Sequence, residues 1–300
     1  MSHRLRYVVE YTGLRAVGAV VNRLPYRAAL TLGWLVAALG LGLWRGRRRE
    51  AERRIREVFG ERYGAAQVRR IAWESLRNLC FTAVEILRGP GMTREWFQRV
   101  ADYGSIVDTL RAELARGHGL ILACPHMGSW ELAGAGAVLS GIPIFSVAGK
   151  QRNPLFDAYL QRTRERMGFE MTTRGTGNLR AILANLKAGK ALALLPDVRM
   201  PTPGIRVRFL GREANVGPGM AAFARHAQVP IYPVINLRRG WARHECRLHP
   251  PIRPNPAADQ AADLQRMTQA VFDIFTAAIE VEPGQWFWYN KRWIFDPLEG

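Results

Sequence analysis

Short apolar runs alternate with longer amphipathic stretches along the chain after Gly119, and this alternation predicts its secondary structure. Runs such as LILA at 120–123 and ALALL at 191–195 have the length of a fully buried strand. Apolar residues spaced three and four apart predict the helices between such runs. The candidate strands are 120–123, 142–147, 191–195, 229–237 and 246–248, and the candidate helices are 51–59, 67–87, 130–139, 154–167, 178–187, 217–227 and 261–279. The pattern predicts an α/β domain with a central, mostly parallel sheet flanked by helices.

An uncharged stretch lies near the amino terminus, at 28–44. Arginines flank it on both sides, and an amphipathic, arginine-dotted stretch precedes it at 5–24. It is short for an upright membrane span, which needs about 20 apolar residues, and a signal peptide would place its apolar core nearer the start. We expect residues 1–50 to form a helical membrane-associating segment, anchored by arginine on anionic headgroups, ahead of an α/β domain over 51–300. The alternative is a buried helix of the folded domain, and the sequence does not separate a membrane span from a surface helix.

The chain is strongly basic, because 43 Lys and Arg against 25 Asp and Glu give a formal net charge of +18. Such a charge indicates an anionic partner, which can be nucleic acid, anionic lipid or an acidic protein. The plainer alternative is a charge that only keeps the protein soluble. The three cysteines, Cys80, Cys124 and Cys246, are odd in number and lack metal-ligand spacing. The sequence therefore indicates neither a disulfide framework nor a zinc site.

The candidate chemistry centres on His126, which follows the predicted strand 120–123 in the run CPHMGSWE. Glu131 falls five residues later, in the first turn of the next predicted helix. A carboxylate there would fix the tautomer of the imidazole and stabilise the imidazolium, so the two residues form a candidate general-base pair. No nucleophilic side chain is needed if the substrate brings its own hydroxyl. Cys124 is the alternative nucleophile, although a small buried cysteine is common on a strand.

A second polar group, Arg152, Asn153 and Asp157, lies at a predicted strand-to-helix junction. Arginine and asparagine suit phosphate or carboxylate groups there, because guanidinium is a bidentate donor. Arg164 and Arg174 continue this basic region, for part of which a solvated helix face is the alternative explanation.

A third group, Asp197 and Arg199, directly follows the predicted strand 191–195. Polar residues in that position lie at the carboxyl edge of the sheet, where α/β proteins bind their ligands. A turn formed by Pro196 and Asp197 explains the same residues without a ligand.

A fourth group, PGQWFWYNKRW at 283–293, combines clustered aromatics with two adjacent cations. It could line an acyl groove, meet a membrane interface or close the hydrophobic core. Stacking on single-stranded nucleic acid is also conceivable, but the chain has no recognisable nucleic-acid module.

Together these four groups resemble the late acyltransferases of lipid A biosynthesis and the related phosphatidylinositol mannoside acyltransferases. HMGSWE at 126–131 is similar to the His-x-Gly-Asn-Trp-Glu form of the glycerolipid acyltransferase motif, with Ser129 in place of Asn. NPLFD at 153–157 and the closing PGQWFW are similar to two further motifs of that family. The resemblance spans nearly the whole chain. It departs in part at PDVR, 196–199, where the lipid A enzymes usually have Pro-Asp-Gln/His-Asp: Asp197 matches the first Asp, but Val198 and Arg199 do not match the next two positions.

The resemblance implies an O-acyltransferase at the cytoplasmic face of the bacterial inner membrane. It would move a fatty acyl chain from an acyl carrier protein or coenzyme A thioester to a hydroxyl of a lipid A-type precursor, and it would need no metal or other cofactor. His126 and Glu131 would be catalytic. The residues implied to bind substrate are Arg152, Asn153, Asp157, Arg164, Arg174, Asp197 and Arg199.

The partners implied are an acyl carrier protein, whose acidity suits the charge of +18, or acyl-coenzyme A, a lipid acceptor and an anionic membrane surface. Because of the departure at 196–199, another glycolipid, an aminolipid or a lysophospholipid stays an alternative acceptor. A basic membrane-binding or nucleic-acid-binding protein without catalysis is the non-enzymatic alternative. It accounts for the charge but not for the pair of His126 and Glu131, and we expect no nucleic acid partner.

Overall fold

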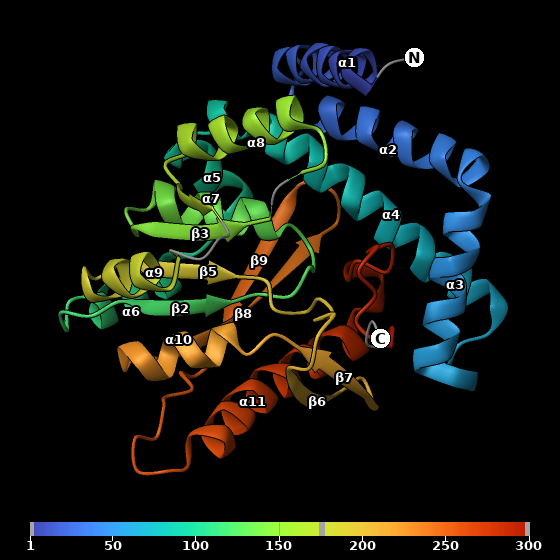
Figure 1. Cartoon of the computed structure of the whole chain (residues 1–300). Coiled ribbons are helices and arrows are strands. Elements are labelled where there is room, and N and C mark those ends of the chain that lie inside the picture. The colour runs from blue at the N-terminus through green and yellow to red at the C-terminus, as the bar shows by residue number, and fades with distance from the viewer. Residues whose placement is uncertain (1–2, 150, 174–177, 298–300) are drawn as a thin grey trace.

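The computed structural model describes residues 3–149, 151–173 and 178–297 (Figure 1). Within these residues, a seven-stranded sheet has the order β1-β9-β8-β2-β5-β3-β4. All neighbouring strands in it run parallel except β8 and β9, which are antiparallel. In spatial order the strands are β1 (Ala101–Asp102), β9 (Arg243–Leu248), β8 (Ile231–Arg239), β2 (Leu120–Ala123), β5 (Ala191–Leu194), β3 (Ile144–Ala148) and β4 (Glu170–Thr173). The predicted α/β class and mostly parallel sheet are confirmed.

Helices cover both faces of this sheet (Figure 1). The helices described are α1 (His3–Arg23), α2 (Tyr26–Leu43), α3 (Arg45–Phe59), α4 (Ala65–Arg88), α5 (Arg94–Val100), α6 (Gly104–Leu114), α7 (Trp130–Leu139), α8 (Pro154–Arg166), α9 (Asn178–Lys187), α10 (Gly219–Ala227) and α11 (Gln260–Val281). Strand β2 shows why the central strands read as unbroken apolar runs. Its Ile121 and Ala123 join the core of α10 and α11, whereas Leu120 and Leu122 join the core of α6 and α7. A strand buried on both faces needs apolar side chains at every position.

A separate hairpin, β6 (Ile205–Phe209) and β7 (Arg212–Val216), packs on α11 and was not predicted. Its turn consists of Leu210 and Gly211, which have φ values of 48° and 76°. Two-residue hairpin turns of this kind usually carry Asn or Gly where φ is positive. A leucine in this position gives no sequence signal for a turn. Leu210 occupies it with its side chain buried in the core.

Helix α2 lies along α4 through a face of small residues (Figure 1). Gly33 illustrates the fit, since a Cβ there would lie 3.1 Å from Val84 Cγ2 and 3.3 Å from Phe81 Cδ1. The opposite face of α2 exposes Leu35, Leu39 and other large apolar side chains. By length and composition, α2 is the one described helix that could cross a membrane. The structure therefore gives α2 one face packed on the protein and one apolar face left open.

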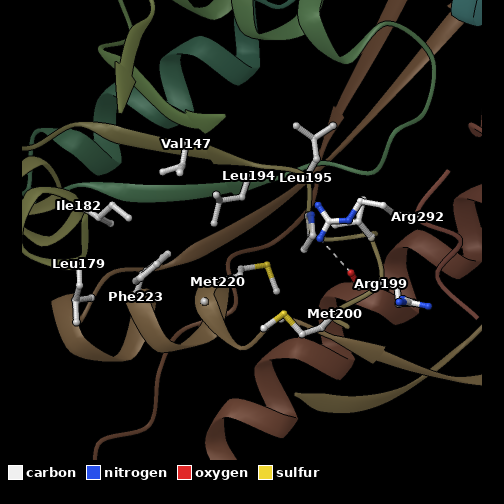
Figure 2. A pocket seen from close by; sticks show the side chains of 14 residues that line it. Val147, Leu179, Ile182, Leu194, Leu195, Arg199, Met200, Met220, Phe223 and Arg292 are labelled. Carbon is white, nitrogen blue, oxygen red and sulfur yellow. Dashed lines mark hydrogen bonds between the residues drawn. The ribbon is translucent and has the colours of Figure 1, made fainter. Parts of the chain in front are cut away.

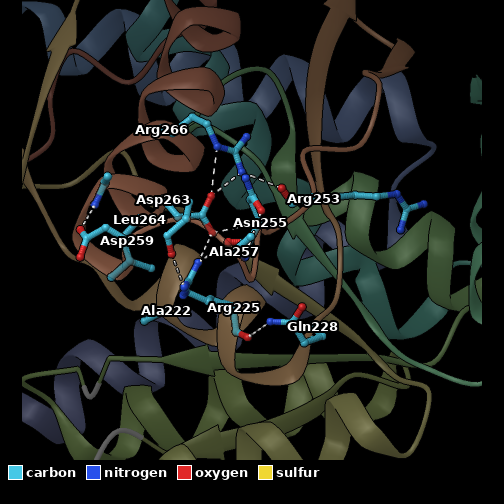
Figure 3. Close-up of polar contacts among 12 residues, drawn as sticks. Ala222, Arg225, Gln228, Arg253, Asn255, Ala257, Asp259, Asp263, Leu264 and Arg266 are labelled. Atoms are coloured by element: carbon cyan, nitrogen blue, oxygen red, sulfur yellow. Dashed lines mark hydrogen bonds and ion pairs between the residues drawn. The ribbon is translucent and has the colours of Figure 1, made fainter.

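A buried carboxylate, Asp263, joins α10 to the start of α11 (Figure 3). It accepts hydrogen bonds from Arg225 at 2.7 Å, from Arg266 and from the backbone N–H of Asn255 at 3.0 Å. Burial works against its charge, but these donors hold the pKa of Asp263 below its usual range. The contacts fix the proline-rich connector between β9 and α11, and with it the helix that supports the hairpin.

Candidate active site

His126 and Asp197 meet because they follow neighbouring parallel strands at the same offset. His126 comes three residues after Ala123, the last residue of β2, and Asp197 comes three residues after Leu194, the last residue of β5. Ala123 and Leu194 lie opposite each other in the sheet. Nδ1 of His126 lies 2.7 Å from Oδ1 of Asp197, and the backbone N–H of His126 donates to Oδ2 at 2.8 Å.

The surroundings of Asp197 determine which ring nitrogen of His126 carries the hydrogen. Asp197 is buried, and the indole Nε1–H of Trp286 donates to its Oδ2 at 2.8 Å. Burial alone would raise its pKa, but the imidazole of His126 and these donors hold the pKa of Asp197 below its usual range. An ionised carboxylate can only accept, so Nδ1 of His126 carries the hydrogen. Nε2 then has a free lone pair on a side chain that is 20% exposed, which is the arrangement of a general base.

Glu131 is not the partner of His126, which corrects the prediction from the sequence. Glu131 lies in the first turn of α7 and pairs with Arg164 of α8, whose Nε donates to Oε2 at 3.2 Å and whose Nη2 donates to Oε1. The charge of each group stabilises the other in a mostly buried position, and Glu131 raises the pKa of Arg164 against the effect of burial. Asp197, which we assigned to substrate, occupies the place predicted for Glu131.

The loop that carries His126 is fixed by a glycine. Gly128 has a φ of 60°, and a Cβ on it would lie 2.3 Å from the carbonyl oxygen of Asn236 on β8. Its N–H donates to Gln285 O at 3.0 Å, and its carbonyl accepts from Thr82 Oγ1 of α4 at 3.2 Å. Only glycine fits both this close approach and the positive φ.

The aromatic tail after η3 (Pro283–Gln285) closes the core and supports the same loop. Trp286, Trp288 and Trp293 are buried, so of the alternatives left open by the sequence, closing the core applies to them. The N–H of Phe287 donates to the carbonyl of His126 at 2.9 Å. The ring of His126 lies 5.1 Å from that of Trp130 and 6.4 Å from that of Phe287, measured between centroids. The imidazole of His126 therefore has two aromatic side chains as neighbours.

An apolar cavity of about 400 Å³ adjoins Asp197 on the α9 and α10 side of the sheet (Figure 2). Its lining includes Pro196 and Val198, the two neighbours of Asp197 in sequence. Figure 2 shows its apolar side chains between the sheet edge and α10, with the guanidinium groups of Arg199 and Arg292 at one end and Leu179 at the other. Cations at one end of an apolar cavity suit a ligand with an apolar chain and an anionic or polar head.

A sequence model of one family, described as bacterial lipid A biosynthesis acyltransferase, matches residues 2–294. The chain belongs to this family. It is 26% identical over 196 residues to the phosphatidylinositol mannoside acyltransferase of Mycolicibacterium smegmatis. The matched region covers 63% of this chain and 62% of that protein, which is less than two thirds of its length. It is 28% identical over 301 residues to the lipid A biosynthesis palmitoleoyltransferase of Escherichia coli, covering 98% of this chain and 93% of that protein.

Among solved structures, the chain is similar to the 1-acyl-sn-glycerophosphate acyltransferase of Thermotoga maritima. The likeness covers 87% of this chain and 99% of that one, at 15% sequence identity and a TM-score of 0.40.

The family's Asn-Pro-Leu-x-Asp segment lies at the start of α8, where its side chains serve the fold. Asn153 caps α8 by accepting from the N–H groups of Leu155 and Phe156, and its amide donates to Tyr7 O and Glu10 Oε2 of α1. All its hydrogen-bonding positions are thus used inside the protein, a different role from the substrate contact we predicted.

The other predicted residues are dispersed. Asp157 accepts from the backbone N–H of Gln151 at 2.8 Å, and Arg152 is exposed beside α1. Arg199 donates to the carbonyl of Pro297 at 2.9 Å at the end of the cavity. Arg174 lies outside the described residues. Of the residues assigned to substrate, the structure therefore brings Asp197 to His126 and Arg199 to the cavity.

Cys124 does not have the properties of a nucleophile. Burial raises the pKa of its thiol well above the usual range, so the thiol is protonated at neutral pH. Its Sγ–H donates to the carbonyl of Pro125 at 3.3 Å, and its sulfur accepts from Asn236 Nδ2 at 3.0 Å. The alternative of a Cys124 nucleophile is therefore unsupported by the geometry.

Proposed function

We propose that this protein transfers a fatty acyl chain from an acyl thioester to a hydroxyl of a lipid A-type precursor or a related glycolipid. The observation that carries the proposal is the contact of 2.7 Å between His126 and Asp197, which leaves Nε2 of His126 to accept a proton. The two sequence neighbours of Asp197, Pro196 and Val198, line the apolar cavity. Membership of the lipid A acyltransferase family supports the class of reaction. The donor is an acyl carrier protein or coenzyme A thioester, of which the acidic carrier protein suits the net charge of +18.

In the proposed reaction, Nε2 of His126 takes the proton of the acceptor hydroxyl as its oxygen attacks the thioester carbonyl carbon. The imidazolium that forms is stabilised by the carboxylate of Asp197. The carbon–sulfur bond then breaks, and the leaving thiolate takes the proton back from His126. The products are an ester and a free thiol. The rings of Trp130 and Phe287 limit the water around the base, which favours transfer to the lipid hydroxyl over hydrolysis.

The cavity beside Asp197 is the proposed place of the acyl chain. It runs from the end with Arg199 and Arg292 toward Leu179 of α9 (Figure 2). The carbonyl end of the chain would then lie near the base and the methyl end near Leu179. Each CH₂ group buried there is worth about 0.8 kcal/mol, so the length of the cavity selects the length of the chain.

Leu179→Trp is expected to shift acyl preference toward shorter chains. Leu179 lines the far end of the cavity and is 49% exposed, so an indole can fill that end without disturbing the core. Competition between thioesters of two chain lengths, read by mass spectrometry, should show about a tenfold change in favour of the shorter chain. Leu179→Ala is the matched control and should not disfavour the longer chain. An unchanged chain-length preference in Leu179→Trp would contradict the placement of the acyl chain in this cavity.

The reaction is tested by mass spectrometry of lipids made by the purified protein in detergent. The donors are acyl carrier protein and coenzyme A thioesters. The acceptors are an under-acylated lipid A precursor, a mannosylated phosphoinositide and a lysophospholipid. A mass gain of one acyl group on the lipid A precursor, absent with His126→Ala, is the expected result.

The other outcomes are equally informative. A mass gain on the mannosylated lipid alone would support acyl transfer but identify a different acceptor. That outcome would agree with the departure from the lipid A enzymes at 196–199. Transfer to none of the acceptors from either donor would contradict the proposal, and binding that weakens strongly with salt would then favour the non-enzymatic alternative.

We further propose that α1 and α2 hold the protein on the cytoplasmic face of the bacterial inner membrane. Their exposed apolar side chains support this, and they include Leu5, Val8, Val9, Val17 and Val20 on α1 and Leu35, Val36, Leu39 and Leu43 on α2. Because the other face of α2 packs on α4, a surface position suits the structure better than a span. Arginines flanking the helix can reach anionic headgroups.

Leu39→Glu is expected to weaken binding to phosphatidylglycerol vesicles severalfold without changing thermal stability. Leu39 is 66% exposed on the open face of α2, so the change removes apolar contact with lipid and adds a repelled charge. Vesicle co-sedimentation measures the effect. Val281→Glu is the matched control, because Val281 is 76% exposed on α11. Equal losses in both variants would count against α2 as the contact.

A further inference from the structure

A buried ion pair lies behind the loop that carries the base. Glu85 of α4 and Arg238 of β8 are both almost fully buried. Nη1 of Arg238 donates to Oε1 of Glu85 at 2.6 Å, and Nη2 donates to Oε2 at 2.8 Å. Neither residue belongs to a motif singled out in the sequence. A bidentate pair of this kind has a defined geometry, so each partner holds the side chain of the other in place.

Two hydroxyl groups donate to the same carboxylate from opposite sides. Tyr26 of α2 donates to Oε1 of Glu85 at 2.6 Å. Ser129 of the His126 loop donates to Oε2. His244 of β9 completes the cluster, with its Nε2 3.1 Å from the hydroxyl of Tyr26. The carboxylate of Glu85 therefore accepts from α2, from β8 and from the loop of the base.

The side chain of Ser129 bonds to Glu85 in place of the contact that is usual at its position. It stands directly before α7, where a serine usually caps the helix by accepting from a backbone N–H. Its side chain makes no such cap and donates to Glu85 instead. The loop is thus anchored to α4 by the Ser129 side chain, between His126 on one side and the pair of Glu131 and Arg164 on the other.

We propose that Glu85, held by Arg238, is a positioning residue that sets the place of His126 through the hydroxyl of Ser129. This rests on the acyl transfer proposed above. His126 must approach the acceptor hydroxyl to within hydrogen-bond distance, and misplacement by about 1 Å can cost on the order of 100-fold in rate. Asp197 orients the ring of His126 and accepts from its backbone N–H, whereas Glu85 holds the loop three residues further on, at Ser129.

The test compares Ser129→Ala with Tyr26→Phe, because each removes one hydroxyl bonded to Glu85. Glu85→Gln is less suitable, since it leaves a buried guanidinium without its counter-charge and is expected to compromise folding. In Ser129→Ala, kcat for transfer to the acceptor is expected to fall about 10- to 100-fold with KM nearly unchanged. In Tyr26→Phe, kcat should stay within about threefold of the wild type, although both variants lose some thermal stability. Ser129→Thr, which keeps a hydroxyl, should restore most of the rate.

A second measurement does not depend on turnover. The low-field proton resonance of the His126 Nδ1–H should shift or broaden in Ser129→Ala and stay unchanged in Tyr26→Phe. Equal losses of kcat and of stability in both variants, with an unchanged resonance, would make the cluster merely structural and overturn the inference. A wild-type protein that transfers no acyl group would instead contradict the proposed function, so the two failures are distinguishable.

Discussion

Replacing His126 by alanine is expected to lower kcat by about 10²- to 10⁴-fold while the protein still folds. The change removes Nε2, the proposed acceptor of the substrate proton, and Asp197 behind it is buried. The fold should tolerate the change, because the backbone contacts of residue 126 with Asp197 and Phe287 do not involve the side chain. Thioester turnover with the best acceptor measures the effect.

Thermal unfolding is the control for His126→Ala. Asp197 keeps its donors from Trp286 and from the backbone of residue 126, so the melting temperature should stay close to that of the wild type. A folded variant that retains the full rate would show that the base lies elsewhere. A variant that loses the rate only because it unfolds would show a much lower melting temperature.

Replacing Asp197 by asparagine is expected to lower kcat by up to about 10⁴-fold, as the corresponding change does in Ser-His-Asp proteases. The amide is nearly the same size as the carboxylate, but its NH₂ group can donate to Nδ1 of His126. The hydrogen of the imidazole then moves to Nε2, and the lone pair that accepts the substrate proton is lost. The kcat at saturating substrate is the quantity to measure.

Glu131→Gln is the matched comparison for Asp197→Asn, because it makes the same chemical change in the neighbouring carboxylate. Glu131 pairs with Arg164 in a mostly buried position and does not touch His126, so Glu131→Gln should lower thermal stability but cost the folded protein no more than about tenfold in kcat. The order of the two losses decides between the partners. If Glu131→Gln abolished turnover and Asp197→Asn kept it, the sequence-based pairing of His126 with Glu131 would be right after all.

The sequence identified His126 but not its partner, and strand order explains why. His126 and Asp197 stand at the same offset from the ends of β2 and β5, and this regularity is visible in the sequence once those strands are predicted. It becomes a contact only because β5 lies next to β2 although β3 and β4 come between them in the chain. Glu131 is nearer in sequence, and helix periodicity alone cannot show that its side chain turns toward α8.

Burial decides which strands could be predicted from the sequence. Strands buried on both faces, such as β2 and β5, leave unbroken apolar runs that sequence alone reveals. The edge strand β4 reads EMTT and has too few apolar residues to stand out from a loop. The hairpin strand β6 reads IRVRF, whose alternation is typical of a half-buried strand, but the run is only five residues long and the prediction passed over it. The buried ion pair of Glu85 and Arg238 was not predicted, because a charged residue within an apolar helix pattern does not indicate which residue it contacts.

The contact between Trp286 and Asp197 has a consequence for the order in which the protein matures. Residues 126, 197 and 286 come from distant parts of the chain, and Trp286 lies beyond every strand of the sheet. Until the tail docks, Asp197 lacks its indole donor, and the loop of His126 lacks its contacts with Gln285 and Phe287. Docking of the tail therefore completes the hydrophobic core and the surroundings of His126 and Asp197 in the same step of folding.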